Sequence, residues 1–142
     1  MRIYEATEPS DLLAEAFARL LPQLSERMTA PDREAVARIV ASPATRQLVA
    51  AAEDGRIVGL LSVALYDVPS GRKAWIEDVV VDAAARGRGI GEALVREALA
   101  LARREGVARV MLTSNATRRA AHRLYERMGF VRYETDCFRL YL

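Results

Sequence analysis

Hydrophobic positions change their spacing along the chain, and each change marks the boundary of an expected element. Across residues 10–41 apolar side chains recur every three or four positions, which indicates amphipathic helices. Ser10 or Asp11 can cap the first of these helices, and Pro43 ends the second. Across residues 47–81 shorter apolar runs alternate with turn residues, and this pattern favours strands.

The pattern predicts eleven elements in the order β-α-α-β-β-β-α-β-α-β-β. They are expected at Ile3–Ala6, Pro9–Leu24, Arg33–Ala41, Gln47–Ala52, Ile57–Tyr66, Ala74–Val81, Gly89–Glu105, Val107–Thr113, Thr117–Met128, Phe130–Tyr133 and Cys137–Leu142. Short turns join the three central strands, so these strands should form an antiparallel meander. No linker divides the chain, which predicts one α/β domain over residues 1–142 with a mixed sheet.

Composition narrows the functional classes. The chain has 142 residues, 51% of them apolar, which is enough for a substantial core. A single cysteine, Cys137, excludes an internal disulfide, and with the single histidine, His122, it excludes a cysteine-rich or multi-histidine metal site. No uncharged run approaches the length of a membrane span, and the N-terminus has no apolar signal core. We therefore expect a cytoplasmic protein that needs no metal and contacts no membrane.

Charge is unevenly distributed although the net charge is only +2, which is too small to indicate a nucleic-acid partner. Residues 1–85 hold 9 basic and 13 acidic side chains, whereas residues 86–142 hold 12 basic and 6 acidic ones. A basic half suits a polyanionic ligand, and an acidic half suits a cationic one. Chance and ordinary solvated faces explain the same asymmetry equally well.

A cluster of glycines, Arg86-Gly87-Arg88-Gly89-Ile90-Gly91, follows a predicted strand and opens a predicted helix. The first N–H groups of a helix lack partners and lie at the positive end of its dipole, so this junction can bind phosphate. The glycine spacing matches neither the dinucleotide fingerprint nor the Walker loop. A tight turn that merely starts a helix is the alternative.

Three segments together resemble the GNAT superfamily of N-acetyltransferases. Arg86–Gly91 fits the family signature Q/R-x-x-G-x-G/A, and Ile76–Asp82 resembles the family's fourth strand. Ala121–Phe130 resembles the family segment A-x-x-x-Y-E-x-x-G-F. The resemblance implies a mostly antiparallel mixed sheet of six to seven strands, flanked by about four helices. It also implies acetyl-CoA as the acyl donor and, through frequent dimers in the family, a possible homodimer.

The resemblance assigns the donor site residue by residue. Backbone amides from Gly87 to Glu92 should hold the pyrophosphate, and the backbone of the fourth strand should pair with the pantetheine arm at a point where a bulge splays it from the next strand. The implied donor-binding residues are Val79, Val80, Val81, Arg86, Gly87, Arg88, Gly89, Ile90, Gly91, Glu92, Asn115 and Arg118. Many relatives carry Asn at the position of Arg118, so this arginine has either a contact with the arm or one with a CoA phosphate.

The same resemblance nominates the groups that move protons. Tyr125 matches the family's tyrosine general acid, although a tyrosine on an amphipathic helix also serves as core packing. Glu77 is the candidate general base or amine anchor, and Asp78 is the alternative. Because the two acids are adjacent on a strand, only one should face the cleft. His122 is expected to pack or cap, and Cys137 to be buried.

These expectations converge on direct transfer of acetyl from acetyl-CoA to a primary amine. A likeness to the aminoalkylphosphonate acetyltransferase type, seen in residues 112–125, favours a small-molecule acceptor. The helical stretch from Ser10 to Ala41 would then form the acceptor-site wall. A protein N-terminal or lysine acetyltransferase and a non-catalytic CoA-binding regulatory domain remain the alternatives.

Overall fold

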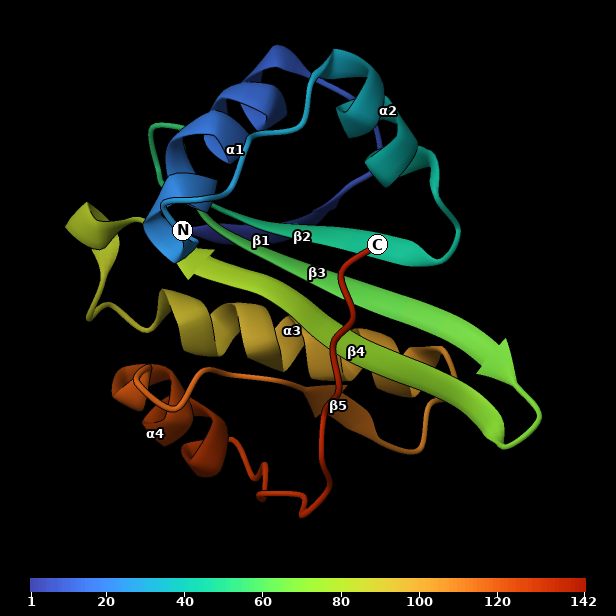
Figure 1. Cartoon of the computed structure of the whole chain (residues 1–142). Helices are drawn as coiled ribbons and strands as arrows, with labels where there is room; N and C mark the ends of the chain where they lie inside the picture. Colours follow the sequence, from blue (N-terminus) through green and yellow to red (C-terminus); the bar gives the residue numbers. More distant parts are fainter.

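A five-stranded sheet runs through the middle of the molecule, which a computed structural model describes from Met1 to Leu142 (Figure 1). The strands lie in the order in which they occur in the chain: β1 (Arg2–Ala6), β2 (Thr45–Ala51), β3 (Ile57–Val68), β4 (Gly71–Val81) and β5 (Val110–Leu112). Neighbours from β1 to β4 are antiparallel, and β5 is parallel to β4. The predicted meander is thus confirmed as β2-β3-β4.

Helices cover both faces of the sheet (Figure 1). The N-terminal helices α1 (Asp11–Leu24) and α2 (Arg33–Ala41) lie over one face, and α3 (Ile90–Arg104) lies over the other, with α4 (Arg119–Arg127) beside it. Side-chain oxygens of Ser10 and Asp32 cap α1 and α2 by accepting the N–H groups of Leu13 and Ala35 at 3.1 and 2.8 Å. Ser10 is one of the two caps that the sequence predicts for the first helix. None of the helices combines the length and the apolar character needed to cross a bilayer.

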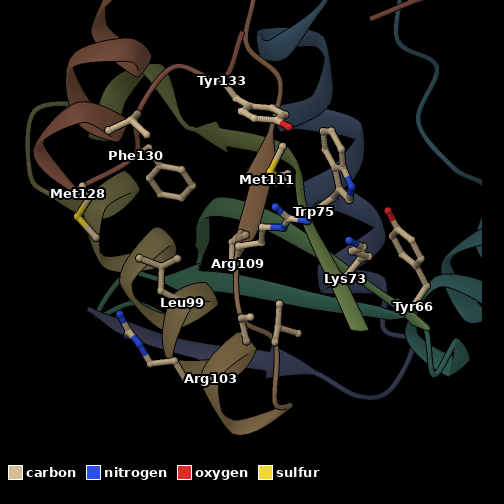
Figure 2. Close-up of a pocket in the computed structure, with 16 residues that line it drawn as sticks. Tyr66, Lys73, Trp75, Leu99, Arg103, Arg109, Met111, Met128, Phe130 and Tyr133 are labelled. Atoms are coloured by element: carbon tan, nitrogen blue, oxygen red, sulfur yellow. The ribbon is translucent and has the colours of Figure 1, made fainter. Parts of the chain in front are cut away.

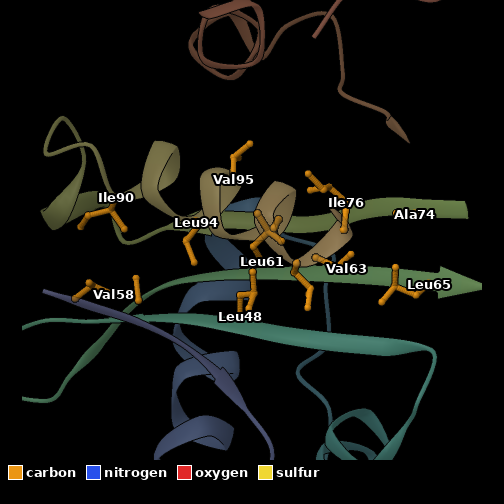
Figure 3. Close-up of a cluster of buried hydrophobic side chains, with 14 of the residues drawn as sticks. Leu48, Val58, Leu61, Val63, Leu65, Ala74, Ile76, Ile90, Leu94 and Val95 are labelled. Carbon is orange, nitrogen blue, oxygen red and sulfur yellow. The ribbon is translucent and has the colours of Figure 1, made fainter. Parts of the chain in front are cut away.

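Two apolar clusters, one on each face, hold these layers together. The larger joins β2, β3 and β4 to α3, and Figure 3 shows Leu94 of the helix turned toward the strand that carries Leu61. The smaller joins α1 and α2 to the opposite face through buried residues that include Phe17, Leu20, Val36, Val49, Leu60 and Val80. Alternation along each strand feeds both clusters, because successive side chains point to opposite faces.

The C-terminal segment departs from the prediction. The family resemblance implied six to seven strands, but the sheet has five, and neither Phe130–Tyr133 nor Cys137–Leu142 is a strand. Side chains of the last segment are exposed, with Phe138 at 91%, and Cys137 is exposed where it was expected to be buried. An alternating pattern produces a strand only where it pairs with another strand, and neither segment pairs with the sheet, although β1 and β5 each have a free edge.

Candidate active site

The glycine cluster forms a turn whose backbone N–H groups donate no hydrogen bond within the protein. Gly87 and Gly89 adopt left-handed φ angles of 76° and 74°, and Gly89 caps α3 without a side-chain hydrogen bond. No backbone N–H from Gly87 to Glu92 donates to any carbonyl or side chain, since the first amide of the helix with a partner is that of Ala93. A Cβ placed at Gly87 or Gly89 would meet nothing within 4 Å. The turn is therefore an open cradle of six donors at a helix N-terminus, which suits a pyrophosphate.

Gly91 has a different structural role from the other two glycines. A Cβ at this position would lie 3.3 Å from Leu124 Cδ2 of α4 and 3.7 Å from Val81 Cγ2 of β4. Its missing side chain therefore allows α4 to approach the first turn of α3 closely. The same contact places α4, the helix that carries Tyr125, against the first turn of α3.

Polar side chains anchor the segment that leads from β4 into the cradle. Asp82 is only 6% exposed and forms an ion pair with Arg19 of α1, whose other guanidinium nitrogen donates to the carbonyl of Ile57. Gln23 accepts the N–H of Ala83 at 2.8 Å, and Arg86 Nε donates to the carbonyl of Val81 at 3.1 Å. The exposed side chain of Arg86 is thus turned back along the strand end.

One edge of β4 is open beside the cradle. The parallel pairing with β5 covers only Ala74–Ile76, whereas the pairing with β3 continues to Val81. From Glu77 onward the β5-facing edge of β4 therefore has no strand partner. This is the splay that the family resemblance implied, and it leaves the backbone of Val79–Val81 accessible to an extended ligand on that side. The side chains of Val79 and Val81 pack toward α3, and Val80 is buried on the opposite face.

A bulge in β4 changes the direction of the two acids. Ser62 of β3 is opposite Glu77 and Leu60 is opposite Val80, so Asp78 and Val79 together face the single residue between them. Asp78 has a φ angle of +51°, which Asp tolerates better than most residues. The expectation that only one acid faces the cleft is therefore wrong. Both Glu77 and Asp78 line the same cavity, because the extra residue interrupts the alternation.

That cavity has a volume of about 440 Å³ and lies between α1, α2 and the sheet. Its lining is Phe17, Leu21, Met28, Thr29, Pro31, Ile39, Thr45, Gln47, Leu60, Ser62, Ala64, Glu77 and Asp78. The N-terminal helical region therefore does wall the space beside the acids. Both acids remain exposed to solvent on one side. Partial desolvation by the cavity wall, and secondarily the charge of Asp78, raises the pKa of Glu77 above its ordinary value of 4.5. A carboxylate with a raised pKa is a better proton acceptor near neutral pH.

Tyr125 lies partly buried on α4 with its ring edge-on to Phe130, at a centroid distance of 5.8 Å and an angle of 64°. Burial raises the pKa of its phenol, and the nearby positive charge of Arg118 opposes that shift. The hydroxyl makes no hydrogen bond within the protein. Asn115, predicted to contact the donor, uses its carbonyl oxygen to accept the N–H and hydroxyl of Thr117 at 3.0 and 2.9 Å.

The model of the acetyltransferase (GNAT) family matches residues 8–130, which span the cradle, the open strand edge and Tyr125. The chain belongs to the GNAT family. Its curated relatives include glucosamine 6-phosphate N-acetyltransferase 1 of Oryza sativa subsp. japonica, which is 36% identical over 127 residues, covering 84% of this chain and 75% of that protein. A mycothiol acetyltransferase of Thermomonospora curvata is 37% identical over 89 residues, or 63% of this chain. This GNAT chain spans less than a third of that relative, since the match covers 29% of it.

Solved structures agree with the family assignment. A putative acetyltransferase from Agrobacterium tumefaciens str. C58 is 28% identical to this chain and has a TM-score of 0.83. The match covers 100% of both chains. An aminoglycoside acetyltransferase from an uncultured soil metagenomic sample has a TM-score of 0.85 at 21% identity, with 99% of this chain and 95% of that one covered. At that identity the likeness concerns the fold alone.

A second, larger hollow of the GNAT chain lies away from the acids. It has a volume of about 580 Å³ and follows the free edge of β5, where Trp75, Met111 and Tyr133 approach one another (Figure 2). Neither acid, nor Tyr125, nor the cradle lines it. Size alone would assign the active site to this hollow, but the candidate proton acceptors Glu77 and Asp78 line the smaller cavity, and Tyr125 lines neither.

Sequence reasoning missed two polar residues of the acid-lined cavity, Gln47 and Ser62. Gln47 is 3% exposed, and its amide hydrogen-bonds Ser62 in the next strand. The only indication in the sequence was that both are polar residues within largely apolar strands, where a buried polar group requires a hydrogen-bond partner. The identity of their partner follows from strand register, which the sequence does not state.

Proposed function

We propose that this GNAT protein is an N-acetyltransferase that transfers the acetyl group of acetyl-CoA directly to a primary amine of a small molecule. The observation that carries the proposal is the cradle of six free amides, Gly87–Glu92, next to the open edge of β4. Few ligands need both a polyanion site and an extended backbone edge, and CoA offers a pyrophosphate followed by an arm with two amides.

Each residue of the site has a defined task in this proposal. The amides of the cradle bind the pyrophosphate, and Arg88 adds positive charge beside it. The backbone of Val79–Val81 pairs with the arm and directs the thioester toward the gap between β4 and β5. Arg118, at the start of α4, is available to a CoA phosphate, and Asn115 can still donate from its amide nitrogen.

The chemistry requires three proton movements. Glu77, directly or through water, accepts a proton from the substrate ammonium, and the resulting amine attacks the thioester carbonyl. A carbon–nitrogen bond forms, the carbon–sulfur bond breaks, and Tyr125 donates a proton to the departing sulfur. The attacking nitrogen then loses its second proton, through water, to the phenolate of Tyr125, which leaves a neutral amide and restores the tyrosine. Asp78 contributes through its charge, which raises the pKa of Glu77. The acetyl group passes directly from CoA to the amine, without a covalent acyl-enzyme intermediate.

Support for a small acceptor comes from the shape of the acid-lined cavity and from the relatives. A cavity of about 440 Å³ has the size of a small-ligand site. The names of the relatives also refer to small molecules, glucosamine 6-phosphate and mycothiol.

Thiol release from acetyl-CoA, measured with a panel of small amines and with peptides bearing free N-termini or lysines, tests the proposal. We expect turnover with small amines and at least about tenfold lower kcat/KM with peptides. Faster turnover of peptides would indicate a protein acetyltransferase. Tight CoA binding with no turnover of any amine would indicate a non-catalytic domain.

A further inference from the structure

The acid-lined cavity contains no positive charge. Glu77 and Asp78 are the only ionisable residues among the thirteen that line it, and no Lys, Arg or His is present. Most of the remaining wall is apolar and comes from α1, α2 and the connection between them. A bound anion would therefore have no counter-charge and would lie near two carboxylates.

Hydrogen bonds fix the orientation of two polar side chains in the remaining wall, Gln47 and Ser62. Gln47 Nε2 donates to the carbonyls of Leu48 and Leu61 at 3.1 and 3.3 Å. The reversed amide would place Oε1 against two carbonyl oxygens, so its orientation is determined by its surroundings. Gln47 Oε1 consequently faces Ser62 and accepts its hydroxyl proton at 2.8 Å.

Ser62 is left without a donor for the cavity. A serine hydroxyl has one proton, and the bond to Gln47 uses it. What Ser62 Oγ can offer to a ligand is therefore lone pairs only. Ser62 is the direct cross-strand partner of Glu77, and the bulge turns Asp78 to the same cavity. Three side chains that can only accept hydrogen bonds thus gather on the sheet wall.

This arrangement complements one chemical group in particular. A primary ammonium has three N–H donors and no acceptor, and it carries the charge that two carboxylates attract. A phosphate would need cations, and the lining has none. A hydroxyl-rich sugar would need several donors, and the lining offers only the hydroxyls of Thr29 and Thr45, whereas apolar contacts are available from α1 and α2.

Resting on the proposed transferase function, we propose that the acceptor is a primary amine on an apolar body without an anionic group, such as an arylalkylamine. We further propose that Ser62, oriented by Gln47, is a specificity-determining residue that binds the ammonium. The chain would then differ in substrate class from its relatives named for glucosamine 6-phosphate.

Binding of matched ligands tests the substrate class separately from catalysis. Calorimetric titrations with tyramine and with tyramine O-phosphate, in the presence and absence of CoA, compare amines that differ only by a phosphate. We expect tyramine to bind at least about 30-fold more tightly, since unpaired like charges disfavour the wrong ligand strongly. Equal or tighter binding of the phosphate ester would overturn the inference.

Turnover measured on the same pair distinguishes the two proposals. Preferred binding of tyramine with no thiol release would contradict the transferase function and leave the cavity assignment supported. Turnover that favours the phosphate ester, or that favours glucosamine 6-phosphate over both, would support a transferase and overturn the substrate class.

Variants of Ser62 test its role. Ser62→Ala should raise KM for tyramine about tenfold while kcat and KM for acetyl-CoA stay within about twofold, and Ser62→Thr, which keeps the hydroxyl, should restore KM. Glu53→Gln, in the exposed turn after β2, removes a remote carboxylate as a control. An unchanged KM in a folded Ser62→Ala variant, or equal defects in the alanine and threonine variants, would refute the assignment.

Discussion

Replacing Tyr125 with phenylalanine removes one hydroxyl and leaves its surroundings intact. The ring contact with Phe130 depends on the aromatic face and edge, so it survives the change. The hydroxyl has no hydrogen-bond partner in the protein, and its loss should alter the free energy of unfolding by less than about 1 kcal/mol. Any large loss of rate therefore reports on chemistry and not on folding.

The size of the rate loss follows from the pKa of the phenol. General acid catalysis is typically worth about 10²–10⁴-fold. The ordinary pKa of tyrosine, 10.0, already exceeds the value of about 8.5 for a free thiol, and burial raises the pKa of Tyr125 further. Proton transfer to the departing thiolate is thus uphill, and the benefit should fall near the lower end. We expect kcat to decrease about 10- to 100-fold, or about 1.4–2.7 kcal/mol in activation free energy.

Steady-state thiol release at saturating amine measures this loss. KM for acetyl-CoA should remain within about twofold of wild type, because Tyr125 is not assigned to the cradle. Tyr133→Phe deletes the same hydroxyl from an exposed tyrosine and should leave both constants unchanged. A Tyr125→Phe enzyme with the wild-type kcat would refute the general-acid role, and a selective rise in KM for acetyl-CoA would reassign the residue to donor binding.

Three other substitutions have expected outcomes. Glu77→Gln should reduce kcat/KM for the amine. Because the pKa of Glu77 is raised in the fold, the free energy of unfolding of the wild type should fall as pH rises from about 4.5 through the folded pKa. Urea unfolding at several pH values should show that the variant lacks this fall. Gly59→Ala would place a Cβ 3.0 Å from Leu94 Cδ1 and 3.1 Å from Ile90 Cγ2. It should therefore lower the free energy of unfolding, measured in urea, by about 1–3 kcal/mol at an unchanged m-value. Unaltered stability would show that α3 can move away from β3. Arg19→Met should lower the free energy of unfolding by about 1–3 kcal/mol and weaken CoA binding, because Asp82 then keeps only Arg56, at 3.4 Å, as an ionic partner. Thermal unfolding measures the first effect and calorimetry with CoA the second. An unaffected CoA affinity would show that this ion pair does not support the cradle.

Most of the scaffold was predictable because local chemistry determines it. Ser10 is a cap residue followed by helical spacing, and the turns at 53–56 and 68–71 have the composition of hairpins. The C-terminal strands were mispredicted because alternation at residues 137–142 describes only the strand's own faces. Whether a strand forms depends on a partner edge elsewhere in the chain, and no local pattern encodes that edge.

The candidate site was predictable to a similar depth. The cradle follows from glycine spacing at a strand-to-helix junction, so its location could be inferred from residues 86–91 alone. The placement of the acids could not, since a single bulge residue, Asp78, reverses the alternation after Glu77. The role of Ser62 depends on its register opposite Glu77 and on a bond to Gln47, both of which are properties of the assembled sheet.

Donor binding by the six free amides is the central claim, and two matched glycine variants test it most directly. Gly89 and Gly55 have φ angles of 74° and 85°, and a Cβ at either would meet nothing within 4 Å, so Glu at each position should cost similar backbone strain. Only Gly89 is in the cradle, where a carboxylate would crowd and repel a pyrophosphate. Calorimetry with CoA should show binding reduced at least about 100-fold in Gly89→Glu and unchanged in Gly55→Glu. Full CoA affinity in a folded Gly89→Glu protein would contradict the account.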